Sequence, residues 1–330
     1  MAANLTPQYL KAQEAYRRAT TPEEELQWLQ IMFREMPKHK ATDKLQADLK
    51  QKISDVKKQM EKQVAAAKKA AQPKLPRQGA GRAVIIGGPN AGKSSLLKAV
   101  TRATPEVAPF PFTTREPQPG MMPWEDVMVQ LIDTPPITAD VYDPNTQGLI
   151  RGADLVLLMV DLGSDTCVDD LQAVLQRIAD TKTRLARDTY LDEDDVGLSY
   201  TKTLLLVNKI DLPEAADRLA LLHEFCPLDF EEFAIATEHG QGMEELRNTI
   251  YQSLDVVRCY TKVPTKKEPD YDKPYTVHRG QTLSDVAELI HRDFAENLKY
   301  ARVWGAAIHP GSQVKGDYVI HDKDVVELHM

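Results

Sequence analysis

The sequence predicts an α/β protein whose core is a doubly wound, mainly parallel sheet, with a helical hairpin before it and a smaller strand-and-helix domain after it. Apolar residues recur at helical spacing in the first 72 residues. Short apolar runs alternate with helical stretches from Ala83 onwards, and the last 70 residues return to strands around one helix. Prolines and glycines between 73 and 81 indicate a hinge. We therefore expect domains at residues 1–79, 80–258 and 259–330.

The N-terminal region carries the signals of an antiparallel helical hairpin. Residues 21–24 combine an N-cap threonine, a proline in the first turn and a glutamate three positions after the cap. Apolar residues follow at helical spacing over 26–36 and again over 45–64, with a turn at 37–42 between them. Thr6 and the proline after it can start a further helix.

The middle of the chain alternates between strand and helix patterns, which predicts a parallel sheet with helices on both faces. The runs expected to form strands are 83–86, 127–132, 155–160, 204–207 and 233–235. The stretches expected to form helices are 93–102, 168–185, 213–225 and 243–254. Tyr190–Val196, with four acidic residues, is expected to be an exposed loop. Near the C-terminus we expect a helix capped by Thr282–Asp285 and a final strand at Asp324–Leu328.

Composition excludes several classes of protein. The longest apolar run, Leu155–Val160, is far shorter than the ~18 residues that a membrane span needs, and the N-terminus has no signal-peptide pattern. Cys167, Cys226 and Cys259 are odd in number and widely spaced, which argues against a disulfide framework or a cysteine zinc site. We expect a reduced, cytoplasmic protein with no membrane partner.

The net charge of −8 is unevenly distributed. Residues 1–80 hold 16 basic and 9 acidic residues, while residues 261–330 are close to neutral and the middle is strongly acidic. A basic end on an acidic body indicates that the end meets a polyanion. The alternative is a solvated helical face rich in lysine.

The segment Gly87–Ser94 fits the phosphate-loop pattern G-x-x-x-x-G-K-[ST] and lies between an apolar strand and a helix. Its glycines let backbone N–H groups surround a phosphate, and the helix N-terminus directs positive charge at it. Lys93 is expected to reach the β- and γ-phosphates and Ser94 to bind Mg²⁺. An accidental glycine-rich turn is the alternative.

A second motif, Asn208-Lys209-Ile210-Asp211, directly follows an apolar run. The carboxylate of Asp211 can accept hydrogen bonds from the N1–H and the exocyclic amino group of guanine, which adenine does not offer in that arrangement. A site built for such donors can discriminate by a factor of ~10⁴ or more. We therefore expect GTP or GDP as the ligand, with Asn208 and Lys209 bracing the loops around the base.

Three further segments complete the expected site. Asp133 ends a strand where an Mg²⁺-binding carboxylate is typical, Thr114 is expected to close onto Mg²⁺ and the γ-phosphate, and Ala236-Thr237-Glu238 is a poor match to the Ser-Ala-Lys loop that meets guanine. The residues expected to bind the nucleotide are Gly87, Pro89, Asn90, Ala91, Gly92, Lys93, Ser94, Ser95, Thr113, Thr114, Asp133, Asn208, Lys209, Asp211, Ala236 and Thr237. Those expected to hold Mg²⁺ are Ser94, Thr114 and Asp133.

These motifs, in this order, resemble the Obg/DRG family of translation-factor-class P-loop GTPases. Residues 111–122 are similar to the switch I segment of that family, and residues 150–158 to the segment beyond switch II. Cys259-Tyr-Thr-Lys, Tyr300–Gly305 and Asp322–Glu327 resemble a TGS domain, a small β-grasp module. The resemblance implies a Mg²⁺-dependent GTPase switch that acts on the ribosome or another RNA–protein complex, through the TGS domain and the basic hairpin. The hairpin lysines concerned are Lys50, Lys52, Lys57, Lys58, Lys62, Lys68 and Lys69.

Departures from the family pattern bear on catalysis. Pro136 replaces a glycine whose N–H contacts the γ-phosphate, and Ile137 stands where Ras-like enzymes place a water-orienting glutamine. We therefore expect slow hydrolysis, or a GTP/GDP sensor that hardly hydrolyses. Asn90 matches the P-loop asparagine of K⁺-activated GTPases, which implies K⁺ stimulation; the alternative is that Asn90 only stabilises its loop. The residues expected to act in catalysis are Lys93, Thr114 and Asn90.

Overall fold

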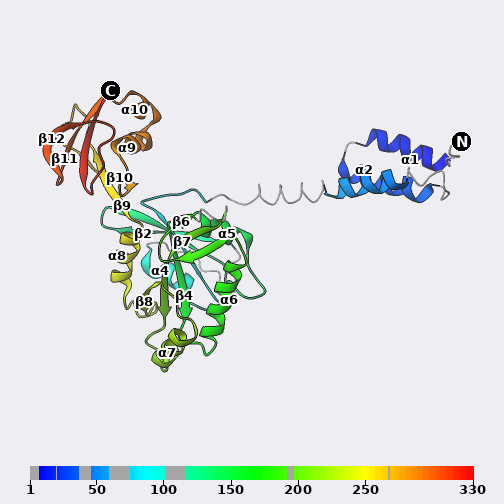
Figure 1. The fold of residues 1–330 in the computed structure, drawn as a ribbon, viewed down its shortest axis with the longest axis horizontal. Helices are drawn as coiled ribbons and strands as arrows, with labels where there is room; N and C mark the ends of the chain where they lie inside the picture. Colours follow the sequence, from blue (N-terminus) through cyan, green and yellow to red (C-terminus); the bar gives the residue numbers. More distant parts are fainter. Residues whose placement is uncertain are drawn as a thin grey trace. The chain divides into compact units, whose positions relative to one another are not determined.

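The fold is described from a computed structural model of the 330-residue chain. It divides into two compact units, Met1–Leu75 and Pro76–Met330, which we describe separately (Figure 1). The residues that the structure describes are 7–19, 21–36, 46–58, 75–101, 116–191, 197–266 and 268–330.

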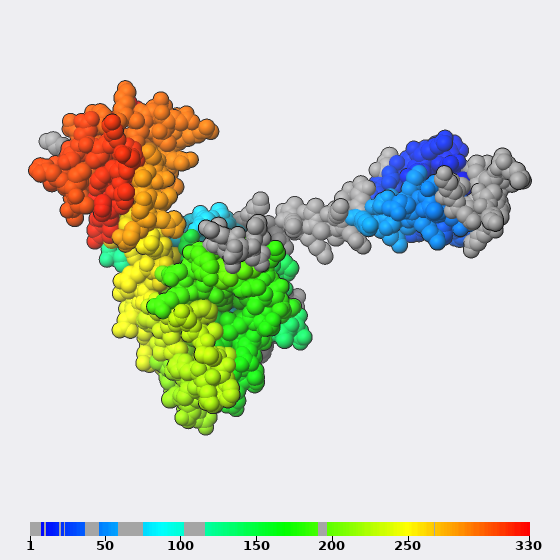
Figure 2. All heavy atoms as spheres, in the orientation of Figure 1, coloured from blue at the N-terminus to red at the C-terminus, as the bar shows by residue number. Residues whose placement is uncertain are grey.

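The first unit is helical. Helix α1 (Pro7–Arg18), helix α2 (Pro22–Glu35) and the helix at 46–58 bury one shared core, and Figure 2 shows α1 and α2 packed against each other as one blue body. The members of that core are Tyr9, Ala12, Leu29, Met32, Met36, Leu49 and Val56. Thr21 caps α2 by accepting a hydrogen bond from the backbone N–H of Glu24, as the sequence predicts. The expected turn at 37–42 lies outside the described residues.

The second unit contains an eight-stranded sheet in which β3, β1, β4, β7 and β8 run parallel. Their bounds are β1 Arg82–Gly87, β3 Val127–Asp133, β4 Leu155–Asp161, β7 Ser199–Asn208 and β8 Glu231–Ile235. Strand β2 (Gln118–Trp124) pairs antiparallel with β3 at the sheet edge. Every residue of β1 is buried, because a central parallel strand is covered on both faces. The expected mainly parallel α/β sheet is confirmed.

Helices cover both faces of this sheet. Figure 1 shows α8 on one side of the strands and α6 on the other. Residues of α4 and α8 join the strands in one apolar core, in which Leu96 and Leu246 are completely buried. The helix bounds are α4 Lys93–Val100, α5 Pro144–Arg151, α6 Cys167–Ala179, α7 Ala215–Phe225 and α8 Met243–Ser253.

Two expectations for this sheet are wrong. The helix predicted to continue to Leu185 ends at Ala179, and Thr183–Ala186 forms strand β5. The loop predicted from Tyr190 begins instead with the short strand β6 (Tyr190–Leu191). Both strands pair with the first residues of β7, which extends five residues before the predicted start at Leu204. Such short pairings depend on a distant partner, so local periodicity does not reveal them.

The chain ends in a five-stranded sheet of order β10-β9-β13-β11-β12, with α9 and α10 before β11. The strands are β9 Val256–Thr261, β10 Asp270–His278, β11 Tyr300–Gly305, β12 Ile308–Val314 and β13 Asp324–His329, and the helices are α9 Leu283–Ile290 and α10 Arg292–Asn297. The predicted cap is confirmed, since Thr282 and Asp285 form a reciprocal capping box at α9. Strand β9 begins three residues before the expected start of the C-terminal domain at residue 259.

Across the described residues, no helix is both long enough and apolar enough to span a lipid bilayer.

Candidate functional site

The candidate site is a cavity of about 770 Å³ formed where β1, β3, β4 and β7 end. Ligands of open α/β sheets bind outside the carboxyl ends of the strands, and this volume suits a small organic ligand. Residues 89–95 line it together with Lys209 and Thr237, all of them expected from the sequence. Pro136 and Glu238, which belong to segments expected near the nucleotide, also line it, and the lining residues that no motif indicated are Thr134, Asp161, Gly163 and Ser164.

The loop between β1 and α4 wraps tightly around one end of the cavity. Asn90 and Gly92 have positive φ angles of 57° and 94°, which turn the backbone around the loop. A Cβ atom on Gly92 would lie 2.2 Å from Nδ2 of Asn208, so the close approach of the two segments requires a glycine there. Helix α4 begins at the next residue, Lys93, and its N-terminus faces the loop.

Lys93 reaches back over its own loop. Its Nζ donates hydrogen bonds to the carbonyl oxygens of Gly87 and Gly88, at 3.2 and 2.7 Å. Burial lowers the pKa of Lys93 to about 8, while the nearby charge of Asp133 opposes that shift. A desolvated ammonium held over a turn of backbone N–H groups can pair with an anionic oxygen that enters the cavity.

Ser94, which lines the cavity, contacts Asp133 behind the cavity wall. Ser94 Oγ donates a hydrogen bond of 2.5 Å to Oδ2 of Asp133, whose side chain is completely buried. Burial raises the pKa of Asp133, and the Ser94 bond and the charge of Lys93 oppose it. The other oxygen, Oδ1, has no hydrogen-bond partner among the described residues. A hydroxyl beside an unpartnered carboxylate oxygen suits a hard cation such as Mg²⁺.

Asn208 joins three segments of the site. Its Nδ2 donates to the carbonyl of Ala91 at 2.9 Å, and its Oδ1 accepts from the backbone N–H of Thr237 at 3.1 Å. Because Asn208 is completely buried, both bonds form in a low-dielectric interior, where an unpaired amide is costly. The strand that leads to Asp211 is thereby tied to the loop that leads to Lys93.

Two further side-chain pairs involve residues of the segment Asn208–Asp211. Nζ of Lys209 lies 2.6 Å from Oδ2 of Asp161, and Oδ2 of Asp211 lies 2.9 Å from Nδ1 of His239. No motif indicates Asp161, yet it is the last residue of strand β4, which lies between β1 and β7, so it lies where the carboxyl ends of the strands meet.

The segment after β3 closes another side of the cavity. Thr134 Oγ1 donates to the carbonyl of Ile85 at 2.7 Å, and Pro136 lines the cavity. The backbone N–H of Ile137 donates to the carbonyl of Gly87 at 3.1 Å, and the Ile137 side chain is buried. This segment therefore presents no side-chain donor at Pro136 or Ile137.

The remaining expected residues are not among those that line the cavity. Gly87, Asp133 and Asn208 contact residues of its wall, as described above, and Ala236 closes a loop by pairing with Gln241. Asp211 does not line the cavity either; it follows the lining residue Lys209 by two positions and pairs with His239. Thr113 and Thr114 lie outside the described residues.

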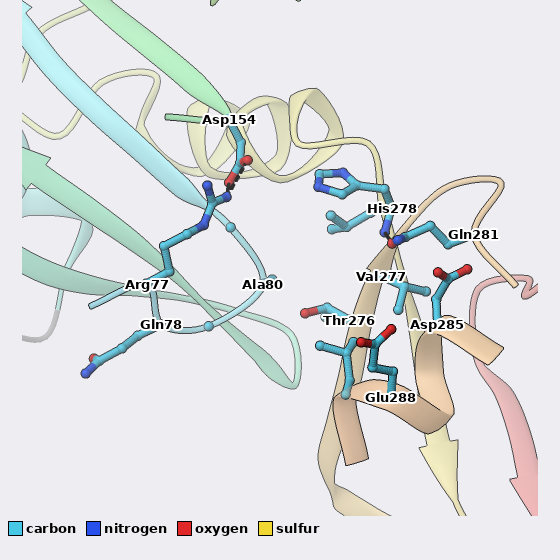
Figure 3. Close-up of a pocket in the computed structure, with 14 residues that line it drawn as sticks. Arg77, Gln78, Ala80, Asp154, Thr276, Val277, His278, Gln281, Asp285 and Glu288 are labelled. Atoms are coloured by element: carbon cyan, nitrogen blue, oxygen red, sulfur yellow. Dashed lines mark hydrogen bonds and ion pairs between the residues drawn. The ribbon is translucent and has the colours of Figure 1, made fainter. Parts of the chain in front are cut away.

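A second cavity, of about 560 Å³, lies between residues 77–81 and the C-terminal sheet (Figure 3). Arg77 pairs there with Asp154 on one wall, and Asp285 and Glu288 of α9 lie on the other. None of the residues expected to bind nucleotide lines it.

Comparison with known proteins agrees with the motifs. Residues 82–192 match the family model described as 50S ribosome-binding GTPase, and residues 257–330 match the TGS domain model. An uncharacterized GTP-binding protein of Methanocaldococcus jannaschii is 28% identical over 93% of this chain and 92% of its own length. Developmentally-regulated G-protein 1 of Arabidopsis thaliana is 25% identical, with 88% of this chain and 87% of that protein covered.

Among solved structures, the YchF GTPase of Schizosaccharomyces pombe has a similar fold. The TM-score is 0.51 at 13% identity, over 77% of this chain and 99% of that one. This likeness bears on the fold alone.

Proposed function

Because the chain belongs to the Obg/DRG-type GTPases with a C-terminal TGS domain, we propose that it hydrolyses GTP slowly, with Mg²⁺, as a switch on a ribosome or another RNA–protein complex. The observation that carries this proposal is the Asn208 side chain, which bonds the loop before Lys93 and the loop at Thr237. The phosphate loop and Lys209 of the base-reading motif thereby line one cavity.

The phosphates of GTP would lie against the loop at 89–95. Lys93, which now contacts two carbonyl oxygens, would exchange them for β- and γ-phosphate oxygens, a stronger charge-assisted pairing. Mg²⁺ would be held by Ser94 and Asp133, with Thr114 as the further ligand expected from the sequence, and the unpartnered Oδ1 of Asp133 supports this assignment. When bound, the ion neutralises charge that develops on the phosphates.

The guanine base would be read by Asp211, with Lys209 held in place by Asp161. Adenine does not offer the two donors that this carboxylate accepts from guanine, which gives the preference for GTP over ATP.

Slow turnover follows from the segment after Asp133. Ile137 has no polar side-chain atom to orient a water, and its backbone N–H is already bonded to Gly87. Pro136 has no N–H to contact a γ-phosphate. We propose that Asn90, which lines the cavity, helps to hold K⁺ as a source of charge compensation. Equal hydrolysis rates in K⁺ and Na⁺ would contradict that part.

Pro136 and Ile137 also favour a second candidate function, a GTP/GDP sensor that binds the nucleotide but barely hydrolyses it. Single-turnover GTP hydrolysis, with and without ribosomes, separates the two candidates. A switch gains rate when ribosomes are added, whereas a sensor stays inert in both conditions. Binding of ATP as tight as that of GTP would contradict both.

The proposed contact with RNA uses the helical unit and the TGS domain. Lys50, Lys52, Lys57 and Lys58 are exposed on the helix at 46–58, and Nζ of Lys50 lies 5.7 Å from the centre of the Phe33 ring. The other lysines of this set, Lys62, Lys68 and Lys69, lie outside the described residues. Cosedimentation with ribosomal subunits in each nucleotide state tests the contact, and phosphate binding should weaken linearly in log salt.

We also propose three domains for the chain and a location in the cytoplasm. The TGS match from residue 257 and the start of β9 at Val256 support a C-terminal domain near the expected 259–330, after a GTPase domain at 80–258 and a helical region at 1–79. Three free, buried cysteines support a reducing compartment such as the cytoplasm.

A further inference from the structure

The carboxylate expected to read guanine has a histidine partner that no motif indicates. Nδ1 of His239 lies 2.9 Å from Oδ2 of Asp211. The Asp211 side chain is 25% exposed and the His239 side chain 69%. Within the described part of the chain, His239 is the residue that pairs with this carboxylate.

The loop that carries His239 is held at both ends. The backbone groups of Ala236 and Gln241 exchange hydrogen bonds of 3.3 and 3.2 Å, which close the loop on itself. Thr237 is bonded through its N–H to Asn208. An imidazole has only two side-chain torsions, so a closed loop can hold it opposite Asp211 at little entropic cost.

The histidine contact is compatible with a bound base. Each oxygen of an ionised carboxylate can accept two hydrogen bonds. Guanine would use one position on each oxygen, through N1–H and the 2-amino group, which leaves a position on Oδ2 beside the Nδ1 atom of His239, 2.9 Å away. An imidazole at this distance limits rotation of the carboxylate and can hold it in the plane that two parallel donors require.

We propose that His239 is a positioning residue for guanine recognition, which orients Asp211 toward the base. This inference rests on the proposed function of the site. In the ordinary Ser-Ala-Lys pattern, the residues that meet the base come before the position of His239. Here the segment Ala236-Thr237-Glu238 departs from that pattern. The next residue, His239, contacts Asp211.

The test measures the affinities of GDP and of inosine 5′-diphosphate (IDP) by calorimetry. IDP lacks the 2-amino group, so the ratio of the two affinities reports how well the carboxylate is oriented. His239→Ala should weaken GDP binding about 3–10-fold and lower the GDP/IDP ratio, as expected for an exposed side chain that contacts a partly exposed carboxylate. His239→Asn keeps an N–H donor near the Nδ1 position and should restore both values to within about twofold.

His223→Ala is the matched control. His223, on α7, is another exposed histidine paired with a carboxylate, at 2.7 Å from Glu232 and not in contact with Asp211. Its loss should leave both affinities unchanged. The inference is overturned if His239→Ala binds GDP as well as the unaltered protein does, or if it loses GDP and IDP affinity equally.

Asp211→Asn separates failure of this inference from failure of the proposed function. Its amide can donate to the 2-carbonyl of xanthine, so the preference should change from GDP to xanthosine 5′-diphosphate. If that change occurs and His239→Ala has no effect, Asp211 reads the base without help from His239. If Asp211→Asn leaves the preference for GDP intact, the proposed guanine site itself is wrong.

Discussion

Arg258, on the first strand of the C-terminal sheet, donates a hydrogen bond of 2.7 Å to Asp126, in the turn that joins β2 and β3. The same guanidinium pairs with Asp322 at 2.8 Å and with Glu125, and its carbon lies 5.1 Å from the centre of the Trp124 ring. The Arg258 side chain is 3% exposed. One buried cation therefore joins the two sheets of the second unit, at a hairpin whose strand β3 ends at Asp133.

Replacing Arg258 by alanine should destabilise this junction. Removing the cation leaves three carboxylates facing one another. Breaking a buried pair in this way should lower the free energy of unfolding by about 2–4 kcal/mol, and we expect the lower part of this range because the carboxylates reach water. Urea unfolding measures the loss. Arg279→Ala is the control, because its pair with Asp255 is exposed on both sides and should contribute less than about 1 kcal/mol. Similar losses in the two variants would contradict the assignment.

Gly92→Ala should abolish tight nucleotide binding while leaving the fold intact. The new Cβ would lie 2.2 Å from Nδ2 of Asn208, at a residue whose φ of 94° disfavours a side chain, so Asn208 must leave Ala91. We expect GDP affinity to fall at least about tenfold, equivalent to 1.4 kcal/mol or more. Gly148→Ala is the control, since a Cβ there meets nothing within 4 Å. Unchanged GDP affinity in Gly92→Ala would refute this account.

Cys259 should make the folded protein sensitive to alkali. Burial raises the pKa of its thiol to about 12, and the charge of Asp324 adds to the shift. The unfolded thiol ionises near the ordinary value of 9, so between pH 9 and 12 the unfolded state holds fewer protons. Stability is therefore fully present below pH 9 and falls above it, by up to about 1.4 kcal/mol per pH unit.

Cys259→Ala should flatten that loss between pH 9 and 10, before unfolded tyrosines ionise. Denaturant unfolding at several pH values measures the slope. Val257→Ala, a change at a buried neighbour that does not titrate, should lower stability by the same amount at every pH. If the two variants have the same pH slope, Cys259 is not the group responsible.

Thr282→Ala should destabilise the C-terminal sheet by removing the cap of α9. Thr282 and Asp285 satisfy each other's backbone N–H groups, and losing such a cap costs about 1 kcal/mol. Thr249→Ala, in the interior of α8, should change stability by less than about 0.5 kcal/mol, because alanine is the better helix former there. Thermal unfolding of both variants provides the comparison, and equal melting temperatures would count against the capping role.

Local patterns were sufficient for much of the fold. Strands β1, β3, β4 and β8 were predicted to within two residues of their bounds. A parallel strand that is buried on both faces consists of consecutive apolar residues, which are easy to recognise in the sequence. The capping signals at Thr21 and Thr282 also predicted helix starts correctly, since a cap is a contact within four residues. The pairing of β5 and β6 with β7 was missed because it depends on residues elsewhere in the chain.

The linear order of residues was enough to predict a phosphate loop around Lys93 and a base-reading motif at Asp211, because each motif is formed by neighbours in the chain. It could not reveal the pairs Lys209–Asp161 and Asp211–His239, nor the bond from Asn208 to Ala91. These contacts join residues 28 to 117 positions apart, and they exist only because the strands end side by side at one edge of the sheet. The tertiary structure therefore decides how the motif residues are held, whereas the motifs themselves can be recognised from neighbouring residues in the sequence.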